Sequence, residues 1–330
     1  MLVFTAACAL PFFPTPCFSA QPLPVLVSIA PQKFILEQIA KDAVQVTTLV
    51  EPGMDPHSYE PSPSKIRAAQ EAGLWFTIGV PFEDIWVPRI TGAAENLHTV
   101  SFIKGITRLK MHEEELLSRP SLAPAPGALS SADAAPAVHD GEENHPEHTP
   151  GHHEQEGGHH GHGEGNGEDP HVWLSPMLVR QMLPGIAREL AKRLPEKAAE
   201  FRANARLFAD ELEKLDKELA VMFAETPQEK RVFLTFHPSW QYYAFNYQLT
   251  ELTIEADGKE PGPQALQHIV DLAKRHAIRR IFVEPQFPKS AARAVAEVIA
   301  ADIVVMDPLA EDIMDTYRSM AAKLVTSFKD

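Results

Sequence analysis

Cysteine is nearly absent from this chain of 330 residues, and both of its cysteines, Cys8 and Cys17, lie within the first twenty positions. If that segment is removed, the remaining chain can form neither a disulfide framework nor a zinc site built on cysteine thiolates. Any metal site in the remaining chain must therefore use histidine and carboxylate side chains.

An excess of positive charge is also lacking. The chain holds 30 lysines and arginines against 45 aspartates and glutamates, a net charge of −15. Residues 133–169 carry ten acidic side chains and no Lys or Arg, and subtracting these ten charges leaves −5 for the rest of the chain. Because nucleic-acid binding needs a basic face, we expect no nucleic-acid partner.

No segment after residue 20 approaches the roughly 20 consecutive apolar residues that a transmembrane helix requires. Residues 1–20 contain no charged side chain and resemble the apolar core of a secretory signal, so we predict a signal peptide at 1–20 with cleavage near Ala20. The stretch from Thr5 to Cys8 is a weak lipoprotein box, which keeps lipid anchoring open as an alternative. We expect the mature chain to be soluble and to lie outside the cytoplasm.

Strands and helices alternate in the first hundred residues. Runs of apolar and β-branched residues predict strands at 25–30, 44–50, 74–79 and 97–102. Helices are predicted after Pro31, from a cap at Ser62 or Ser64 to Glu71, and over 82–91. This alternation is typical of a parallel sheet with helices on both of its faces.

The pattern stops from about 113 to 169, where Pro, Ala, Gly, Glu and His dominate, and we predict a disordered loop there. This loop holds eight of the fifteen histidines of the chain: His139, His145, His148, His152, His153, His159, His160 and His162. Such a composition has loose affinity for zinc, nickel and copper alike. The alternative is a solvated linker without a role in metal binding.

Helical spacing returns after the loop. Residues 176–193 are predicted to form one helix, and a second begins near Pro195, a residue that suits a first helical turn. Its apolar positions continue to about 224: Phe201, Ala205, Phe208, Leu212, Leu215, Leu219 and Phe223. At 1.5 Å per residue this helix would run roughly 45 Å, long enough to form a rigid spine behind two lobes.

The second half of the chain repeats the alternation of the first. Strands are predicted at 231–236, 249–255, 280–284 and 303–306, with helices ending near Tyr243, beginning at Pro263, and covering 289–301 and about 310–328. The predicted fold class is therefore α/β, with two Rossmann-like lobes of mostly parallel strands joined by a long spine helix. The predicted boundaries are an N-terminal lobe at 21–175, a helical connection at 176–224 and a C-terminal lobe at 225–330.

Three histidines and one aspartate lie just beyond the predicted strands or the loop: His57, His171, His237 and Asp307. Ligands of open α/β sheets bind beyond the carboxyl ends of the strands, so side chains from both lobes are expected to meet in the cleft between the lobes. Neutral imidazoles with a carboxylate suit zinc in a four-coordinate site. No local spacing such as His-Glu-x-x-His supports this hypothesis, which depends on position alone.

Each of these residues also has a structural alternative. Asp307 precedes Pro308 and could simply begin a turn. Glu255 and Glu284 end strands, and each could orient an imidazole, serve as a spare ligand or face solvent. The histidines that have no such placement are interpreted as surface or structural residues: His98, His112, His268 and His276.

Several motifs, in order, resemble the solute-binding proteins of ABC importers for zinc and manganese, a group that includes zinc-uptake binding proteins and lipoprotein adhesins. The resemblance covers the chain from about residue 24 to its end. The matching stretches are Val27-Ser28-Ile29-Ala30-Pro31, Pro52 to Pro61, Asp169-Pro170-His171-Val172-Trp173-Leu174, Phe236-His237-Pro238-Ser239-Trp240, Glu284-Pro285-Gln286-Phe287 and Asp307-Pro308-Leu309.

The resemblance implies two α/β lobes joined by a long helix, with metal in the cleft. It implies that His57, His171 and His237 are the three histidine ligands, and that Asp307 matches a carboxylate ligand of the manganese-type members. A histidine at 237, rather than glutamate, and the His-rich acidic loop are similar to the zinc type. The chain departs from the family in having no basic signal region and no cysteine for the disulfide seen in some members.

The leading hypothesis is a monomeric periplasmic protein that captures Zn²⁺ and delivers it to the membrane permease of an ABC importer, without enzymatic activity. One alternative is manganese or iron as cargo of the same fold, although hard ions prefer more oxygen ligands. The other is a zinc hydrolase, since three protein ligands and an open fourth position are also a catalytic arrangement. A hydrolase would need Glu255 or Glu284 as general base, and no catalytic motif accompanies them.

Overall fold

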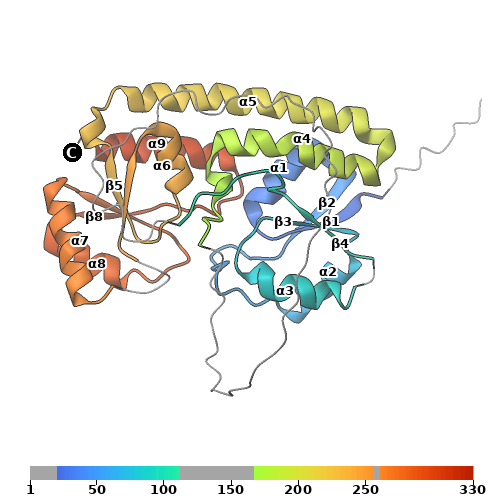
Figure 1. Cartoon of the computed structure of the whole chain (residues 1–330), viewed down its shortest axis with the longest axis horizontal. Helices are drawn as coiled ribbons and strands as arrows, with labels where there is room; N and C mark the ends of the chain where they lie inside the picture. Colours follow the sequence, from blue (N-terminus) through green and yellow to red (C-terminus); the bar gives the residue numbers. More distant parts are fainter. Residues whose placement is uncertain (1–20, 95, 112–166, 256–260, 330) are drawn as a thin grey trace, which may run out of the picture.

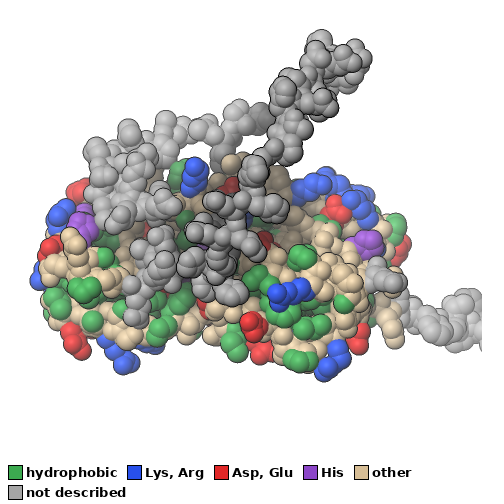
Figure 2. Space-filling view, turned by 60° about the horizontal axis from the view of Figure 1, so that its bottom comes forward, with side chains coloured by type: hydrophobic (Ala, Val, Ile, Leu, Met, Phe, Trp, Pro, Cys, Tyr) green, Lys and Arg blue, Asp and Glu red, His purple; other side chains and the backbone are tan. Residues whose placement is uncertain are grey.

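The computed structural model describes residues 21–94, 96–111, 167–255 and 261–329. The predicted signal peptide and nearly all of the predicted His-rich loop, together with His112, lie outside these residues. Figure 1 shows two α/β lobes side by side, with one long helix running across both. On the face shown in Figure 2, acidic, basic and hydrophobic side chains are interspersed over both lobes.

The N-terminal lobe is built on a parallel sheet of four described strands in the order β2-β1-β3-β4. Its register places Val25 beside Val46 on one side and beside Leu74 on the other. The strands are β1 (Leu23–Val27), β2 (Val44–Thr48), β3 (Leu74–Thr77) and β4 (His98–Ser101), with helices α1 (Ala30–Ala40), α2 (Pro63–Glu71) and α3 (Phe82–Thr91) between them.

The C-terminal lobe repeats this plan with a parallel sheet in the order β6-β5-β7-β8. In both lobes the second strand in space is the first in sequence, so the crossover pattern is the same. The elements are β5 (Val232–Thr235), α6 (Gln241–Tyr247), β6 (Thr250–Thr253), α7 (Pro263–Arg275), β7 (Arg280–Val283), α8 (Ser290–Ile299) and β8 (Asp302–Val305). The carboxyl end of β5 is followed directly by the segment that holds His237.

Three further helices lie along the same side of the two lobes, and one of them, α5, runs across both: α4 (Pro176–Arg193), α5 (Ala198–Ala224) and α9 (Ile313–Ser327). The long helix α5 has 27 residues, about 40 Å at 1.5 Å per residue. It begins three residues later than predicted because Pro195–Lys197 form a separate 3-10 turn. All seven apolar positions predicted for its inner face are buried. In Figure 1 this helix lies over α4 in one lobe and over α9 in the other.

The start of α9 also differs from the prediction of about 310. Asp312 is its N-cap, and its carboxylate accepts the backbone N–H groups of Met314 and Asp315 at 2.9 and 3.0 Å. Such a cap satisfies donors that the first helical turn leaves free, so the helix begins after it. The prediction that Ser62 or Ser64 caps α2 is resolved in favour of Ser62, whose side chain accepts from Lys65 N.

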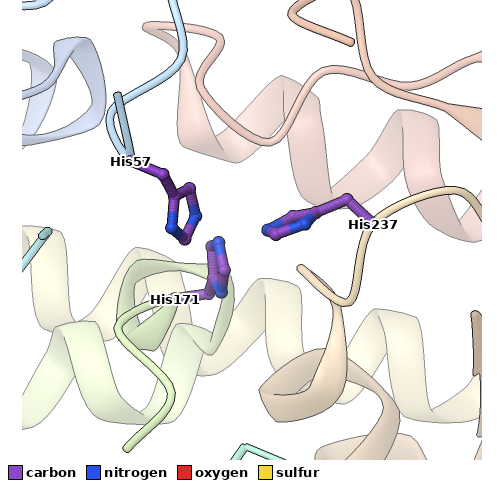
Figure 3. A group of neighbouring side chains, drawn as sticks. All are labelled: His57, His171 and His237. Atoms are coloured by element: carbon purple, nitrogen blue, oxygen red, sulfur yellow. The ribbon is translucent and has the colours of Figure 1, made fainter. Parts of the chain in front are cut away.

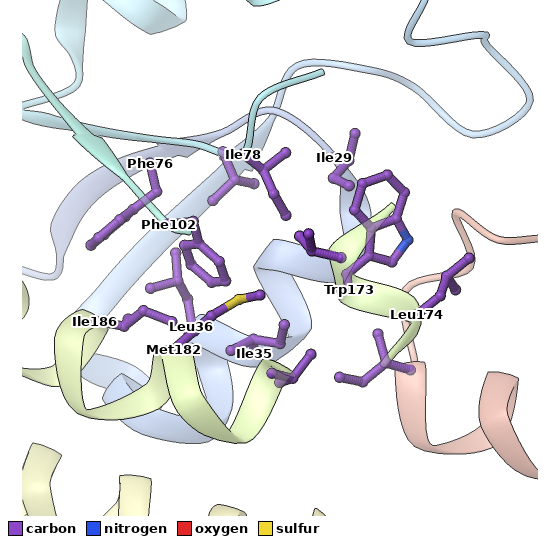
Figure 4. Packing of buried hydrophobic residues seen from close by; sticks show 14 of the residues in the cluster. Ile29, Ile35, Leu36, Phe76, Ile78, Phe102, Trp173, Leu174, Met182 and Ile186 are labelled. Atoms are coloured by element: carbon purple, nitrogen blue, oxygen red, sulfur yellow. The ribbon is translucent and has the colours of Figure 1, made fainter. Parts of the chain in front are cut away.

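A single hydrophobic core extends through the N-terminal lobe and into the C-terminal one. It includes β1 and β3, the inner faces of α4 and α5, and aromatic residues of the second lobe such as Tyr243, Phe282 and Tyr317. Figure 4 shows part of it, where Trp173 packs near Ile29 and Leu174. A smaller core under α7 and α8 completes the outer side of the C-terminal lobe. Because the lobes share buried surface, their separation is set by packing as well as by the spine.

Among the described residues, the longest helices are too polar, and the apolar segments too short, for any helix to cross a bilayer.

Candidate metal centre

Three imidazoles from distant parts of the chain converge between the lobes. One possible ligand atom from each of His57, His171 and His237 lies within 4.8 Å of the other two. The ring centroids are 4.9 Å apart for His57 and His237, 5.5 Å for His171 and His237, and 6.0 Å for His57 and His171. Figure 3 shows the three rings pointing toward a common space. Among the described residues, no other group of histidine or carboxylate side chains meets in this way.

His57 belongs to the loop between β2 and α2. The turn is formed by Asp55, whose Oδ1 accepts the His57 backbone N–H at 2.9 Å and whose Oδ2 accepts the Ser58 hydroxyl at 2.9 Å. Burial lowers the pKa of His57 to about 3, and the neighbouring His237 and His171 contribute to the same shift. The imidazole is therefore neutral at pH 7, which is the form that binds a metal ion.

His171 precedes a buried 3-10 helix, Val172–Leu174, at the centre of the molecule. Asp169 Oδ1 accepts the His171 backbone N–H at 2.8 Å and contacts the ring Nδ1 at 2.7 Å. Asp169 is fully buried and His171 is only 5% exposed, so this contact is shielded from water. With Nδ1 bound to a carboxylate, Nε2 is the nitrogen left for the space between the rings.

His237 follows β5 by two residues and is held in a similar way. Its Nδ1 lies 3.1 Å from Glu255 Oε2, and the ring of Phe287 packs against it with a centroid distance of 4.8 Å. Its Nε2 is buried and has no hydrogen-bond partner among the described residues. Burying such an atom unpaired is costly, and a metal ion bound at Nε2 would satisfy it.

Asp307 is not part of the group in which the three histidines meet. It is half-buried beyond β8, where its Oδ1 accepts the Gln286 side-chain N–H at 2.8 Å and the Leu309 backbone N–H at 2.9 Å. The bond with Gln286 ties the segment after β7 to the segment after β8, and the bond with Leu309 lies within the latter. Both bonds are compatible with the turn alternative noted from the sequence.

The remaining candidates are two glutamates and three histidines. Glu255 contacts a ring nitrogen of His237, as an orienting carboxylate would. Glu284 is 1% exposed with both carboxylate oxygens unpaired among the described residues, and burial raises its pKa well above the usual value. His98, His268 and His276 are exposed on β4, on α7 and at the end of α7.

A model of the family described as zinc-uptake complex component A, periplasmic (ZnuA), matches residues 25–330. The chain belongs to this family. A crystal structure of a ZnuA shares 32% sequence identity and a TM-score of 0.74, covering 93% of this chain and 99% of that one. A zinc-bound ZnuA deletion mutant is similar, with 32% identity, a TM-score of 0.73 and coverage of 93% and 98%.

Relatives outside the solved structures are more distant. The zinc-binding lipoprotein AdcA of Streptococcus pneumoniae is 26% identical over 289 residues, which are 87% of this chain and 50% of AdcA. The chain thus spans about half the length of that protein. A putative metal-binding protein of Chlamydia trachomatis is 24% identical over 298 residues, 90% of this chain and 88% of that protein. The family that the chain matches is described as a periplasmic component of a zinc-uptake complex.

The space between the three imidazoles is small. The cavity there has a volume of about 20 Å³, which is room for about one ion or water molecule. The wall is mainly apolar and includes Val80, Pro170, Trp173, Phe287 and Leu309. The wall also contains the oxygen-bearing side chains of Asp55, Ser239 and Gln286.

Two functional residues were missed by the sequence reasoning, Asp55 and Asp169. Each stands two positions before a candidate ligand, in the repeated tripeptide Asp-Pro-His, and each accepts that histidine's backbone N–H. The repetition of this tripeptide is the signal in the sequence that could have identified them.

Proposed function

We propose that this chain captures Zn²⁺ outside the cytoplasm with His57, His171 and His237 and delivers it to the membrane permease of an ABC importer. The observation that carries the proposal is the convergence of three imidazoles, two of them with Nδ1 on a buried carboxylate. In zinc sites such partners fix the tautomer and the ring direction, so that Nε2 is presented to the ion. The membership of the ZnuA family supports the same cargo.

The fourth ligand position belongs to water or to Asp307 in this proposal. One oxygen of Asp307 already accepts two hydrogen bonds, from Gln286 and from the Leu309 backbone. Ligation by Asp307 would use its other oxygen and would require the side chain to keep or exchange those bonds. A water molecule needs no such change, and four-coordinate zinc accepts either.

Zinc is favoured over manganese by the donor set. Three imidazole nitrogens suit a borderline ion, whereas Mn²⁺ and other hard ions prefer oxygen ligands. The apolar side chains of Trp173, Phe287 and Leu309 supply none, and the oxygen-bearing side chains described in the wall are Asp55, Ser239 and Gln286. Two relatives point the same way, since the ZnuA deletion mutant was solved with zinc bound and AdcA is described as a zinc-binding lipoprotein.

Binding, rather than hydrolysis, is the activity we propose. A zinc hydrolase needs a free carboxylate beside the metal-bound water and space for a substrate. Here Glu255 contacts the His237 ring, and the space between the imidazoles has room for about one water molecule. Glu284 is not among the described residues that line this space.

The proposed place of action is the periplasm, with 1–20 as a signal peptide and the mature protein acting as a monomer. The partner is the permease of the importer, as the family description of an uptake-complex component suggests. The proposal treats the His-rich tract as an accessory collector of metal ions.

The test is calorimetric titration of Zn²⁺ into the mature protein lacking residues 139–162, beside the same protein with His171→Ala. We expect one tight site in the first protein and none of comparable affinity in the second. Loss of all tight binding on deletion of the tract alone would contradict the cleft site. Parallel titration with Mn²⁺ is expected to show weaker binding by the same site.

A further inference from the structure

Two segments that flank residues 112–166 run side by side and are called the neck here: 109–111 and 167–169. Met111 N–H donates to Gly167 O at 2.7 Å, and Asp169 N–H donates to Leu109 O at 2.8 Å. The middle residues of the two segments pair as an antiparallel bridge. The first segment follows β4 of the N-terminal lobe and the second precedes α4, yet the neck is held by α6 of the C-terminal lobe.

Tyr242 of α6 inserts its hydroxyl into the neck. The hydroxyl accepts the Leu109 backbone N–H at 2.9 Å and donates to Asp169 O at 2.9 Å. In a regular antiparallel pair, Leu109 and Asp169 would exchange two direct N–H···O=C bonds. Here one bond is direct and the phenol hydroxyl replaces the other, which widens the neck at this pair. Tyr242 is 3% exposed, and burial raises its pKa, so the hydroxyl keeps the proton that it donates.

A second side chain of α6 contacts the same neck. The Gln241 side-chain N–H donates to Lys110 O at 3.0 Å. Consecutive residues of one helix thus bind the backbone of three neck positions, Leu109, Lys110 and Asp169. The helix α6 lies in the C-terminal lobe beside the coil that leaves β4 (Figure 1). The neck is therefore anchored across the lobe boundary by defined hydrogen bonds.

The neck leads directly to a candidate zinc ligand. Asp169 is its last residue, and only Pro170 separates it from His171. The Asp169 backbone is fixed by Leu109 and Tyr242, while its carboxylate contacts the His171 ring Nδ1 at 2.7 Å. A shift of the Asp169 backbone would carry its carboxylate with it, and the imidazole would turn or lose its partner.

We infer that Tyr242 is a positioning residue for His171, which acts through Asp169 by holding the neck at a fixed width. The inference rests on the proposed function, in which His171 binds zinc. Without the hydroxyl, Leu109 N–H and Asp169 O are either left unpaired or close into a direct bond. Both results displace Asp169. Mutation of a partner of a metal-binding histidine typically lowers metal affinity by 10- to 100-fold. We expect the loss of the Tyr242 hydroxyl to lower the affinity mainly by speeding zinc release.

The experiment compares Tyr242→Phe with the wild type as full mature chains, each loaded with one equivalent of Zn²⁺. Release into excess chelator is followed by stopped flow, and the visible spectrum of the Co²⁺ form reports the ligand geometry. The matched control is Tyr243→Phe. Tyr243 is the next residue of α6 and is fully buried, but its hydroxyl donates to Tyr317 O at 2.9 Å, away from the neck.

We expect Tyr242→Phe to speed zinc release from the tight site by roughly 10-fold and to alter the Co²⁺ bands, within the range known for such partners. Tyr243→Phe should lower thermal stability without changing the release rate or the bands. Equal changes in the two variants, or no change in Tyr242→Phe, would overturn the inference. If Tyr242→Phe does not fold, Gln241→Ala takes its place in the test. Faster zinc release from Gln241→Ala is then the expected result, and an unchanged release rate would overturn the inference that the neck positions His171.

The proposed function fails separately. If His171→Ala leaves the slow release phase of the wild type intact, His171 is not a ligand, whatever Tyr242→Phe does. If His171→Ala removes that phase and Tyr242→Phe leaves it unchanged, only the role of Tyr242 is rejected.

Discussion

The two Asp-Pro-His turns of the chain have the same sequence but differ in the contacts that the aspartate makes with its histidine. In both, the aspartate Oδ1 accepts the histidine backbone N–H, at 2.9 Å for His57 and 2.8 Å for His171. The Asp169 carboxylate is fully buried and also contacts the ring of its histidine. The Asp55 carboxylate is half-buried and uses its other oxygen on the Ser58 hydroxyl. The tripeptide therefore sets the backbone, and burial of the carboxylate decides whether it also orients the ring.

This difference divides the three imidazoles. His171 and His237 each have Nδ1 against a buried carboxylate, so their free nitrogens point in defined directions. His57 has no such partner among the described residues, and its ring is placed by the loop and by the neighbouring rings. We interpret the first two as an oriented pair that the third completes.

The largest expected effect comes from removing the imidazoles one at a time and comparing His171 and His237 with His57. His171→Ala and His237→Ala should weaken Zn²⁺ binding more than His57→Ala, by roughly a further 10-fold, because either change breaks the oriented pair. Competition with a chelator of known affinity, at one equivalent of Zn²⁺, gives the three dissociation constants. If His57→Ala is the most damaging of the three, the division is wrong.

The next effect tests the two aspartates directly. Asparagine can still accept the histidine backbone N–H but carries no negative charge. Asp169→Asn and Asp55→Asn therefore differ mainly in whether a charged partner of the imidazole ring is lost. We expect roughly 10- to 100-fold weaker binding for Asp169→Asn. For Asp55→Asn we expect a much smaller change, since the hydrogen bonds described for its carboxylate go to the His57 backbone and the Ser58 hydroxyl rather than to an imidazole ring.

The same competition assay measures both variants, and thermal unfolding of the metal-free proteins controls for folding. Glu255→Gln sharpens the result, because Glu255 holds His237 as Asp169 holds His171. It should resemble Asp169→Asn. Equal losses for Asp55→Asn and Asp169→Asn would remove the distinction between the turns.

Much of this arrangement could be predicted from sequence because parallel strands send their following residues to one edge. That rule places His237 beyond β5 and Asp307 beyond β8, and both lie two residues past their strands. It does not say which neighbours a side chain will meet there. Asp307 meets Gln286 and the Leu309 backbone, which depends on how the loops after β7 and β8 pack. The start of α9 was misplaced for a local reason, the cap formed by Asp312.

Contacts across the lobes were the least predictable. The Trp173 side-chain N–H donates to Pro308 O at 2.8 Å, and the Tyr317 hydroxyl donates to Trp173 O. These partners are more than 130 positions apart in sequence. No periodicity or motif links residues so distant, since their meeting is decided by the packing of whole lobes. They nevertheless hold the 3-10 helix that follows His171.

The last prediction is a pH dependence of stability that belongs to His57. Its pKa is lowered to about 3 by burial and by the two other imidazoles, whereas an unfolded chain has the ordinary value of 6.5. Between these values the unfolded state binds more protons, so the stability contributed by neutral His57 is present above pH 6.5 and is lost as pH falls toward 3. The loss is at most about 1.4 kcal/mol per pH unit.

Urea unfolding of the metal-free wild type and of His57→Gln measures this effect between pH 8 and pH 4. We expect a constant difference in the free energy of unfolding above pH 7, and a shift in favour of His57→Gln as the pH falls below 6.5, because glutamine takes up no proton. His98→Gln, at an exposed position of β4, is the matched control and should follow the wild type. If the difference between wild type and His57→Gln stays constant down to pH 4, His57 has the same pKa in the folded and the unfolded chain. The ring would then be more accessible to solvent than its place between two imidazoles indicates.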